Sequence, residues 1–344
     1  MIRRAFAFID KTVFKSSNLI IFFFIITCLL SRLNSDFFFI DILGQLGFQI
    51  VICGVILFFI FLFLKRFWVS VICFLICIFF SADILFSCNH CKNSIKNELQ
   101  IRNKIRLMTF NISYNNPVSN FENIKEMILF ENPDIIQFQE ISHEMQLKIK
   151  SLKSVFPYSA NLDSPLHLFD SVILSKHPLK NINVVNQFIL KTNIILNETE
   201  LTIIGTHLPA PLNSLLFNLY SDLLSKFTNV TGTHPIPIAT LDVAIKQMKN
   251  LKTLADNSNK NLIIMGDLNM TTTSKRFTNF LKDTNLYTYA SYKHPTFTWP
   301  TFVPDFLGIQ IDHVLFSKNF KIIKKKTTNH FGSDHRPLIV DLSY

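Results

Sequence analysis

The sequence is poor in cysteine over most of its length and poor in charge throughout, and both shortages limit what the protein can be. All six cysteines lie within residues 28–91, so residues 92–344 cannot be held together by disulfide bonds. Charged residues make up 17% of the 344-residue chain, against about 25% in typical soluble domains. Because 49% of the residues are hydrophobic, the composition also excludes an intrinsically disordered chain.

The hydrophobic residues are concentrated in the first quarter of the chain. Three segments have few or no charges and lengths near the ~20 residues that a membrane span needs. The predicted spans are residues 16–33, 44–64 and 67–85. A cleaved signal peptide is the alternative for the first, but no small-residue cleavage pattern follows it and two more apolar runs do. The sequence therefore predicts a transmembrane anchor over residues 1–90, a linker over 91–103 and a soluble domain over 104–344.

Basic residues near these segments predict the orientation. Four precede the first span and two separate the second from the third: Arg3, Arg4, Lys11 and Lys15, then Lys65 and Arg66. Such residues favour the cytoplasmic side. Three spans then make the protein a multi-pass membrane protein whose soluble domain is extracytoplasmic, which means periplasmic in a Gram-negative cell. Two spans would reverse this.

The soluble domain is basic. Residues 92–344 hold 27 of the 34 basic and 20 of the 24 acidic residues, a net charge of +7. The densest basic run is Lys321–Lys326, which is also typical of a solvated strand end or loop. A basic domain favours polyanionic partners, either nucleic acid or anionic lipid headgroups. The sequence indicates no protein partner.

Short strand-like runs alternate with amphipathic stretches along this domain, which predicts an α/β fold. The predicted strands are residues 105–112, 134–139, 171–174, 201–206, 262–265, 311–316 and 337–341, with helices over 121–130 and around Ile245 to Leu254. Between His207 and Asp267 the chain is too long for one crossover helix, so residues 212–240 are predicted to be an insertion.

Polar groups follow these strands at their ends, where an α/β sheet usually places its active site. In chain order they are Phe110-Asn111, Gln139-Glu140, Thr206-His207, Gly266-Asp267-Leu268-Asn269, Asp312-His313 and Ser333-Asp334-His335-Arg336-Pro337. Carboxylate and amide oxygens suit Mg²⁺ or Mn²⁺, whereas the lack of cysteine disfavours zinc. An Asp–His pair beside such a metal indicates activation of water.

The order and content of these groups resemble the endonuclease/exonuclease/phosphatase superfamily, the metal-dependent phosphoesterases related to DNase I. The resemblance covers residues 104–344. It implies a two-sheet α/β sandwich, preceded here by about three transmembrane helices, and a Mg²⁺-dependent phosphodiesterase. Two departures stand out: Ser113 replaces an acidic residue found in some nucleases, and Asp170 replaces a usual glycine.

The resemblance also implies a role for each motif residue. Glu140 would be the principal Mg²⁺ ligand, with Asn111 and Asp334 completing the metal side. Asp267 and Asn269 would orient the attacking water and the scissile phosphate. His335 would be the general base or a phosphate-facing imidazole, held by Asp312. His207 would contact the phosphate or assist the leaving group.

The substrate stays open between classes. A nuclease is the first expectation, and aromatic residues in Phe297-Thr-Trp-Pro-Thr-Phe302 are suited to stacking on bases. A phospholipid or sphingomyelin-type headgroup phosphodiesterase is the alternative, since the same residues can seat an acyl chain and the domain is tethered to a bilayer. A catalytically silent membrane scaffold is the third reading, against which the full set of motifs argues.

Overall fold

The computed structural model describes residues 2–86, 90, 103–163, 170–210, 241–258, 260–289 and 296–344. They fall into two compact units, residues 1–89 with 272–278 and residues 90–271 with 279–344. The predicted insertion 212–240 and nearly all of the predicted linker 91–103 lie outside the described residues, so both stay predictions.

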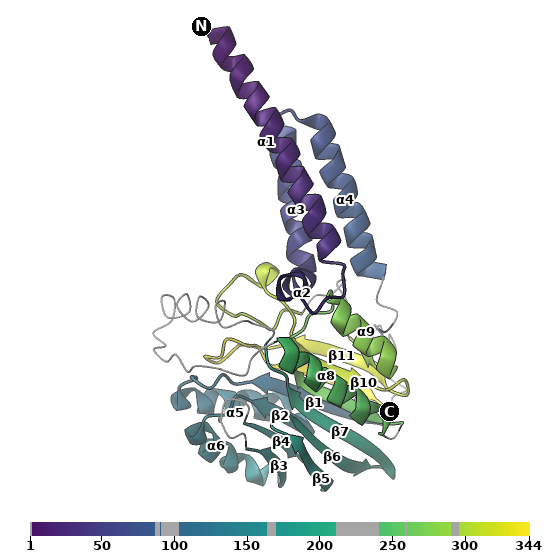
Figure 1. Ribbon diagram of the computed structural model, residues 1–344. Coiled ribbons are helices and arrows are strands. Elements are labelled where there is room, and N and C mark those ends of the chain that lie inside the picture. The colour runs from purple at the N-terminus through teal and green to yellow at the C-terminus, as the bar shows by residue number, and fades with distance from the viewer. Residues whose placement is uncertain are drawn as a thin grey trace. The chain divides into compact units, whose positions relative to one another are not determined.

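The first unit consists of helices (Figure 1). They are α1 (Ile2–Leu30), α2 (Phe38–Gln45), α3 (Gly47–Phe63) and α4 (Phe67–Phe86). Helices α3 and α4 pack against each other, and the approach is close where Gly54 faces Cys77, because a Cβ at Gly54 would collide with the Cys77 sulfur. Large apolar side chains remain exposed on these helices, including Phe63 at 87% and Trp68 and Phe79 at 77%.

Within the described residues, no helix taken alone has both the length and the apolar character to cross a bilayer. The predicted span 44–64 is interrupted at Leu46, where the helix axes of Phe39–Gln45 and Gly47–Phe63 meet at 77°, and only together do these two reach the required length. Two glycines, Gly44 and Gly47, flank the break, and glycine is a weak helix former. The apolar stretches Lys15–Leu30 and Phe67–Ala82 are shorter.

Residues 272–278 belong to this first unit through polar contacts as well as packing. The Thr273 hydroxyl donates to the Gly44 carbonyl at 2.8 Å. Arg276 bonds Asp41 at 3.1 Å and Asp36 at 3.2 Å. Asp41 is buried, and a buried carboxylate needs such a partner to offset its lost hydration.

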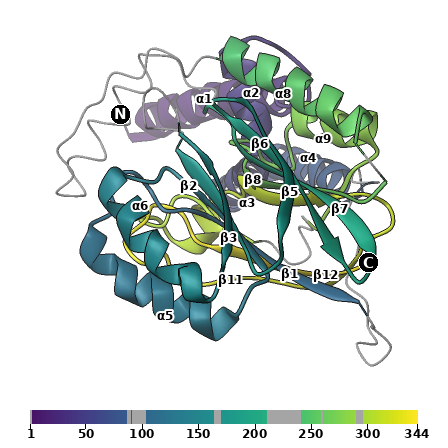
Figure 2. The same ribbon diagram turned by 90° about the horizontal axis from the view of Figure 1, so that it is seen from below.

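The second unit is built on two six-stranded sheets, which lie face to face in Figures 1 and 2. One has the order β11-β12-β1-β2-β4-β3 and the other β5-β6-β7-β8-β10-β9. The first contains β1 (Lys104–Asn111), β2 (Ile135–Gln139), β3 (Tyr158–Leu162), β4 (Ser171–Ser175), β11 (Lys321–Thr327) and β12 (Leu338–Ser343). The second contains β5 (Leu179–Asn186), β6 (Ile189–Leu196), β7 (Thr199–His207), β8 (Leu262–Asp267), β9 (Tyr287–Thr288) and β10 (Asp312–Phe316).

Helices cover the outer faces of the two sheets. They are α5 (Phe121–Glu131), α6 (His143–Ile149) and α8 (Leu241–Asp256), with short 3₁₀ turns η2 (Val118–Asn120), η3 (Lys150–Ser154) and η4 (Asp305–Leu307). Helix α9 (Lys275–Thr284) begins in the first unit and ends in the second. Helix α5 buries Phe121, Ile124 and Ile128 on one face, against side chains of β1, β2 and β4. A second core, with Leu107, Ile203 and Val340 among its members, fills the space between the sheets. Because successive side chains of a strand point to opposite faces of the sheet, a strand such as β1 contributes to both cores.

The strands that the sequence predicts are present, and the fold is an α/β sandwich of two mixed sheets. Strands β3, β5, β6, β9 and β11 are additional. The basic run Lys321–Lys326 lies on strand β11, in agreement with the alternative that it is part of a strand. Within it, Lys326 pairs with Glu131 at 2.5 Å and the Lys325 ammonium lies 4.7 Å from the Tyr289 ring centroid, so part of the charge is used inside the fold.

Candidate active site

The site is assembled at strand ends that the sheet registers bring together. Asn111 pairs with Gln139 between the parallel strands β1 and β2, and His207 pairs with Asp267 between the parallel strands β7 and β8. Asp312, the first residue of β10, also pairs with Asp267. Because the ends of these parallel strands and the start of the antiparallel strand β10 lie at the same edge, motifs that are far apart in sequence converge there.

Unusual backbone conformations direct several of these side chains. Glu140 and Asn269 have φ angles of 52° and 50°, in the left-handed region. This conformation costs roughly 1–2 kcal/mol for a residue such as glutamate. Gly266 has φ 143°, and a Cβ there would overlap the Thr206 carbonyl oxygen. The glycine of the Gly-Asp-Leu-Asn motif is therefore required for Asp267 to reach the site.

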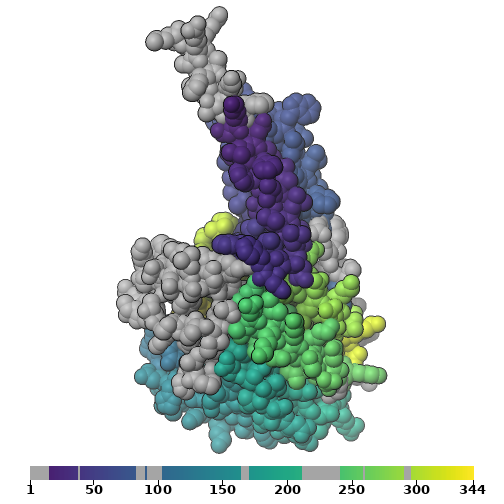
Figure 3. All heavy atoms as spheres, in the orientation of Figure 1, coloured from purple at the N-terminus to yellow at the C-terminus, as the bar shows by residue number. Residues whose placement is uncertain are grey.

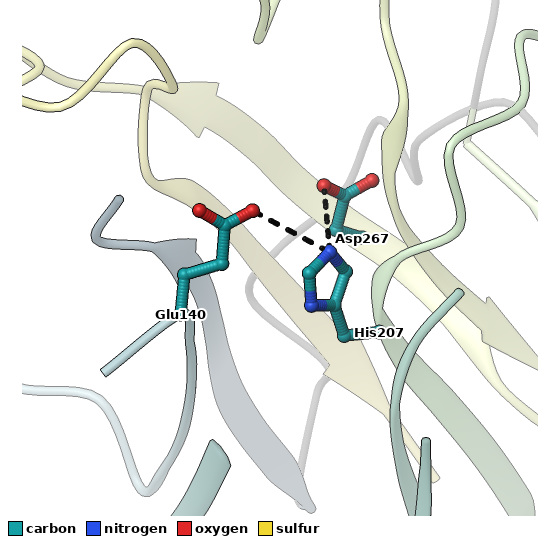
Figure 4. A group of neighbouring side chains, drawn as sticks. All are labelled: Glu140, His207 and Asp267. Carbon is teal, nitrogen blue, oxygen red and sulfur yellow. Dashed lines mark ion pairs between the residues drawn. The ribbon is translucent and has the colours of Figure 1, made fainter. Parts of the chain in front are cut away.

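Glu140, His207 and Asp267 form the first group of potential ligands (Figure 4). The Nε2 atom of His207 lies 3.5 Å from Glu140 Oε1 and 3.8 Å from Asp267 Oδ2. The Glu140 side chain is 29% exposed, whereas those of His207 and Asp267 are buried. Glu140 is thus the member through which this group meets solvent.

Asn111 connects the two carboxylates of this group. Its Nδ2 donates to Glu140 Oε1 at 2.8 Å and to Asp267 Oδ2 at 3.1 Å, while its Oδ1 accepts from the Ser113 backbone at 3.0 Å. Asn111 therefore turns its nitrogen toward the carboxylates. The predicted role of Asn111 as a metal ligand needs its oxygen there and so requires the amide to turn.

Asp267, Asp312 and His335 form the second group, which shares Asp267 with the first. His335 Nδ1 lies 2.9 Å from Asp312 Oδ2, and His335 Nε2 lies 3.7 Å from Asp267 Oδ2. All three side chains are almost completely buried. The predicted Asp312–His335 pair is present in the geometry that fixes the orientation of an imidazole.

The remaining predicted residues lie beside these groups. Asn269 donates to the Leu208 carbonyl at 2.8 Å, and its backbone N–H donates to Asp267 at 2.8 Å. Asp334 accepts from the Trp299 indole at 3.0 Å, and its charge raises the pKa of Glu140. Asp334 is in neither group of potential ligands, so its predicted role as a ligand stays a prediction.

Burial and mutual repulsion set the protonation of the cluster. Burial, followed by the charge of Asp312, raises the pKa of Asp267 to about 8. Removal from bulk water, followed by the charge of Asp334, raises the pKa of Glu140. Burial lowers the pKa of His207 to about 3, so His207 is neutral near pH 7. Its contacts with Glu140 and Asp267 are therefore those of an uncharged ring. Burial also lowers the pKa of His335, but Asp312 and Asp267 outweigh it and hold that pKa well above 6.5.

This donor set fits a hard divalent cation. Two carboxylates and an imidazole offer ligand atoms within 4.8 Å of one another. Burial is the first cause of the raised pKa values of Asp267 and Glu140, and the charges of Asp312 and Asp334 add to it, so a nearby cation would favour the ionised carboxylates.

The sequence did not predict the hydrogen bonds that hold the loops of this site in place. The Ser333 hydroxyl donates to the Asn111 carbonyl at 2.7 Å and accepts from the His335 backbone at 2.9 Å. Asn116 donates to the Ile112 and Phe331 carbonyls. These residues lie far apart in sequence, so only the position of Ser333 within the Ser-Asp-His motif gave a signal.

The model of the Endonuclease/Exonuclease/phosphatase family matches residues 108–335, which is more than half of the chain. No curated protein matches the sequence.

Solved structures share the fold. Truncated Caenorhabditis elegans TDP2 is 14% identical with a TM-score of 0.51, covering 70% of this chain and 98% of its own. The human Nocturnin catalytic domain, with bound sulfate, is 19% identical with a TM-score of 0.50, covering 70% and 94%. D. rerio TDP2, in complex with a single-strand DNA product, is 10% identical with a TM-score of 0.52, covering 70% and 99%.

Proposed function

Since the chain belongs to the endonuclease/exonuclease/phosphatase family and is a metal-dependent phosphoesterase, we propose that it is a Mg²⁺-dependent nuclease held at a membrane. The observation that carries the proposal is the convergence of Glu140, Asp267 and the Asp312–His335 pair on one edge of the sandwich. Support for a nucleic acid substrate comes from the net charge of +7 on residues 92–344.

Glu140 is the principal metal ligand in this proposal, with Asp334 and Asn111 beside it. Mg²⁺ matches the oxygen donors better than a softer ion does. When bound, the ion would supply neutralisation of the charge that develops on the phosphate oxygens. Glu140 is suited to bind it because its side chain is the member of the first group that reaches solvent.

In this proposal the buried residues accept the proton from water and orient the phosphate. Asp267 accepts a proton from water in its ionised form, which the positive charge of a bound cation would favour. The water oxygen bonds to phosphorus and the phosphate–oxygen ester bond breaks. Of its two predicted roles, His335 takes that of the phosphate-facing imidazole, because its raised pKa keeps it protonated. Asn269 orients the phosphate, and neutral His207 donates a hydrogen bond to the leaving oxygen.

The test is nicking of supercoiled DNA by the full-length chain purified in detergent. We expect Mg²⁺-dependent nicking that EDTA stops and that His335→Ala reduces by about 10²–10⁴-fold. His143→Ala is the matched control, since His143 is exposed on α6 and belongs to neither group of potential ligands. Absence of nicking by the folded protein, with cleavage of phospholipid headgroups instead, would replace the nuclease by the lipid phosphodiesterase. Inactivity on both substrates in the presence of bound metal would leave the silent scaffold.

Membrane attachment is supported by the apolar surface of the first unit. The first unit exposes far more apolar surface than a soluble helical unit usually does. The exposed side chains include Phe22, Phe59, Phe63, Trp68 and Phe79. Figure 3 shows the outer surface of α1 and α4, on which such side chains lie. Alkaline phosphatase fused after Tyr344 tests the extracytoplasmic orientation, because this reporter is active only outside the cytoplasm. An inactive but stable fusion in the membrane fraction would reverse the orientation.

A further inference from the structure

The segment Thr298–Thr301 contacts both elements that carry the Asp312–His335 pair, which are the start of β10 and the loop before β12. Thr298 is fully buried, and its Oγ1 accepts from the backbone N–H groups of Ile311 and Asp312 at 3.2 and 3.3 Å. Its carbonyl accepts from the Arg336 backbone at 2.8 Å. One residue therefore ties the start of β10 to the loop that carries His335.

The other end of the segment holds the loop around Asp334. The Thr301 backbone N–H donates to the Asp334 carbonyl at 3.0 Å, and the Thr301 hydroxyl donates to the Ser333 carbonyl at 2.9 Å. Ser333 is in turn bonded to the Asn111 carbonyl. The loop is thus fixed from two sides, by β1 and by this segment.

Trp299 reaches a functional side chain directly. Its indole N–H donates to Asp334 Oδ2 at 3.0 Å, and its ring centroid lies 6.5 Å from that of His335. The indole is a donor only, so the hydrogen bond fixes the direction in which the Asp334 carboxylate points. Trp299 is half-buried, so it is not needed merely to fill the interior.

We propose that Thr298–Thr301 is a positioning clamp, in which Trp299 orients the Asp334 carboxylate for metal binding while Thr298 and Thr301 fix the loops that carry Asp312 and His335. Trp299 acts through Asp334 and touches no reacting atom. The proposal rests on the metal dependence and on the metal role of Asp334 in the proposed function, but not on the substrate being nucleic acid.

The experiment is direct titration of the full-length chain with Mn²⁺, followed by electron paramagnetic resonance of the free ion. Trp299→Phe keeps an aromatic ring and removes only the N–H donor. We expect it to weaken Mn²⁺ binding by about 10–100-fold, as loss of a partner behind a ligand typically does. The metal-free melting temperature and the KM at saturating metal should stay near those of the parent. Trp68→Phe, at the other of the two tryptophans, is the matched control and should leave Mn²⁺ affinity unchanged.

A second pair of variants keeps the test decisive if Trp299→Phe misfolds. Thr301→Val removes the hydroxyl that donates to Ser333, and Thr301→Ser retains it. We expect weaker Mn²⁺ binding for Thr301→Val and recovery for Thr301→Ser. Unchanged Mn²⁺ affinity in Trp299→Phe overturns the clamp, as does a rise in KM for an oligonucleotide alone, which would make Trp299 a stacking surface. If the parent binds Mn²⁺ but cuts no nucleic acid, the nuclease fails while the clamp is still judged by the affinities.

Discussion

The two ligand groups of the site share Asp267 but differ in their exposure and in how tightly they are held. In the group of Glu140, His207 and Asp267 the nearest side-chain pairs lie 3.5 and 3.8 Å apart, and Glu140 is 29% exposed. In the group of Asp267, Asp312 and His335 every side chain is buried, and one pair is bonded at 2.9 Å. The first arrangement suits exchange of an ion with solvent, whereas the second suits a fixed charge and proton.

Breaking the buried group should have the largest effect. Asp312→Asn keeps the shape of the side chain but removes the charge that holds His335 protonated and oriented. We expect kcat to fall by about 10²–10⁴-fold with little change in metal affinity. Steady-state kinetics on DNA and Mn²⁺ titration measure the two quantities. A loss below tenfold would show that the Asp312–His335 pair is structural.

Breaking the open group should act on the metal. Glu140→Gln removes the exposed carboxylate, and we expect metal affinity to fall by on the order of a hundredfold. Excess Mg²⁺ should restore part of the activity, in contrast to Asp312→Asn. Glu144→Gln is the matched control, because Glu144 is exposed on α6. If high Mg²⁺ rescued both Asp312→Asn and Glu140→Gln equally, the distinction between the two groups would fail.

Loosening the link between the groups should have a smaller effect. Asn111 donates to Glu140 and to Asp267, and hydrogen bonds to charged groups contribute about 1.5–3 kcal/mol. Asn111→Ala should therefore reduce kcat/KM by roughly tenfold to a hundredfold. Asn123→Ala, at an exposed position of α5, is the control. Activity equal to that of the parent would show that Asn111 is dispensable for both groups.

The sequence predicted the members of both groups because each motif adjoins an apolar run that is recognisable as a strand. Gly266-Asp267-Leu268-Asn269 follows a run of apolar residues, and that pattern places Asp267 at a sheet edge. It did not predict that Asn111 turns its nitrogen toward the carboxylates, since that choice depends on the Ser113 backbone. The Trp299 contact with Asp334 was likewise hidden, because it joins positions 35 residues apart.

Hydropathy was a weaker guide to the first unit. The apolar run over residues 44–64 predicted one continuous helix, yet the chain bends by 77° at Leu46. A hydropathy average depends on side chains alone and takes no account of backbone conformation. The break in the helix is flanked by two glycines, which are weak helix formers. Thr273 also bonds the Gly44 and Gln45 carbonyls, which offers those groups partners outside the helix.

The smallest expected effect is a change of stability with pH, and it distinguishes the groups by protonation. The folded-state pKa of Asp267 is raised from 3.8 to about 8, so the stability it contributes is present below pH 3.8 and is lost as pH rises toward 8. The pKa of His335 is raised above 6.5, so its contribution is likewise lost as pH rises through the folded value. His207, with a pKa lowered to about 3, opposes this trend only below pH 6.5.

The metal-free protein should therefore melt at a lower temperature at about pH 8 than at pH 6.5, and metal affinity should rise over the same interval because binding releases protons. Asp267→Asn removes the shared group, and it should flatten most of the slope in melting temperature. Asp283→Asn, in which an exposed carboxylate paired with Lys252 is replaced, should leave the slope intact. If Asp267→Asn also leaves it intact, the pKa of Asp267 is not raised in the metal-free fold, and the slope has to be assigned to another group.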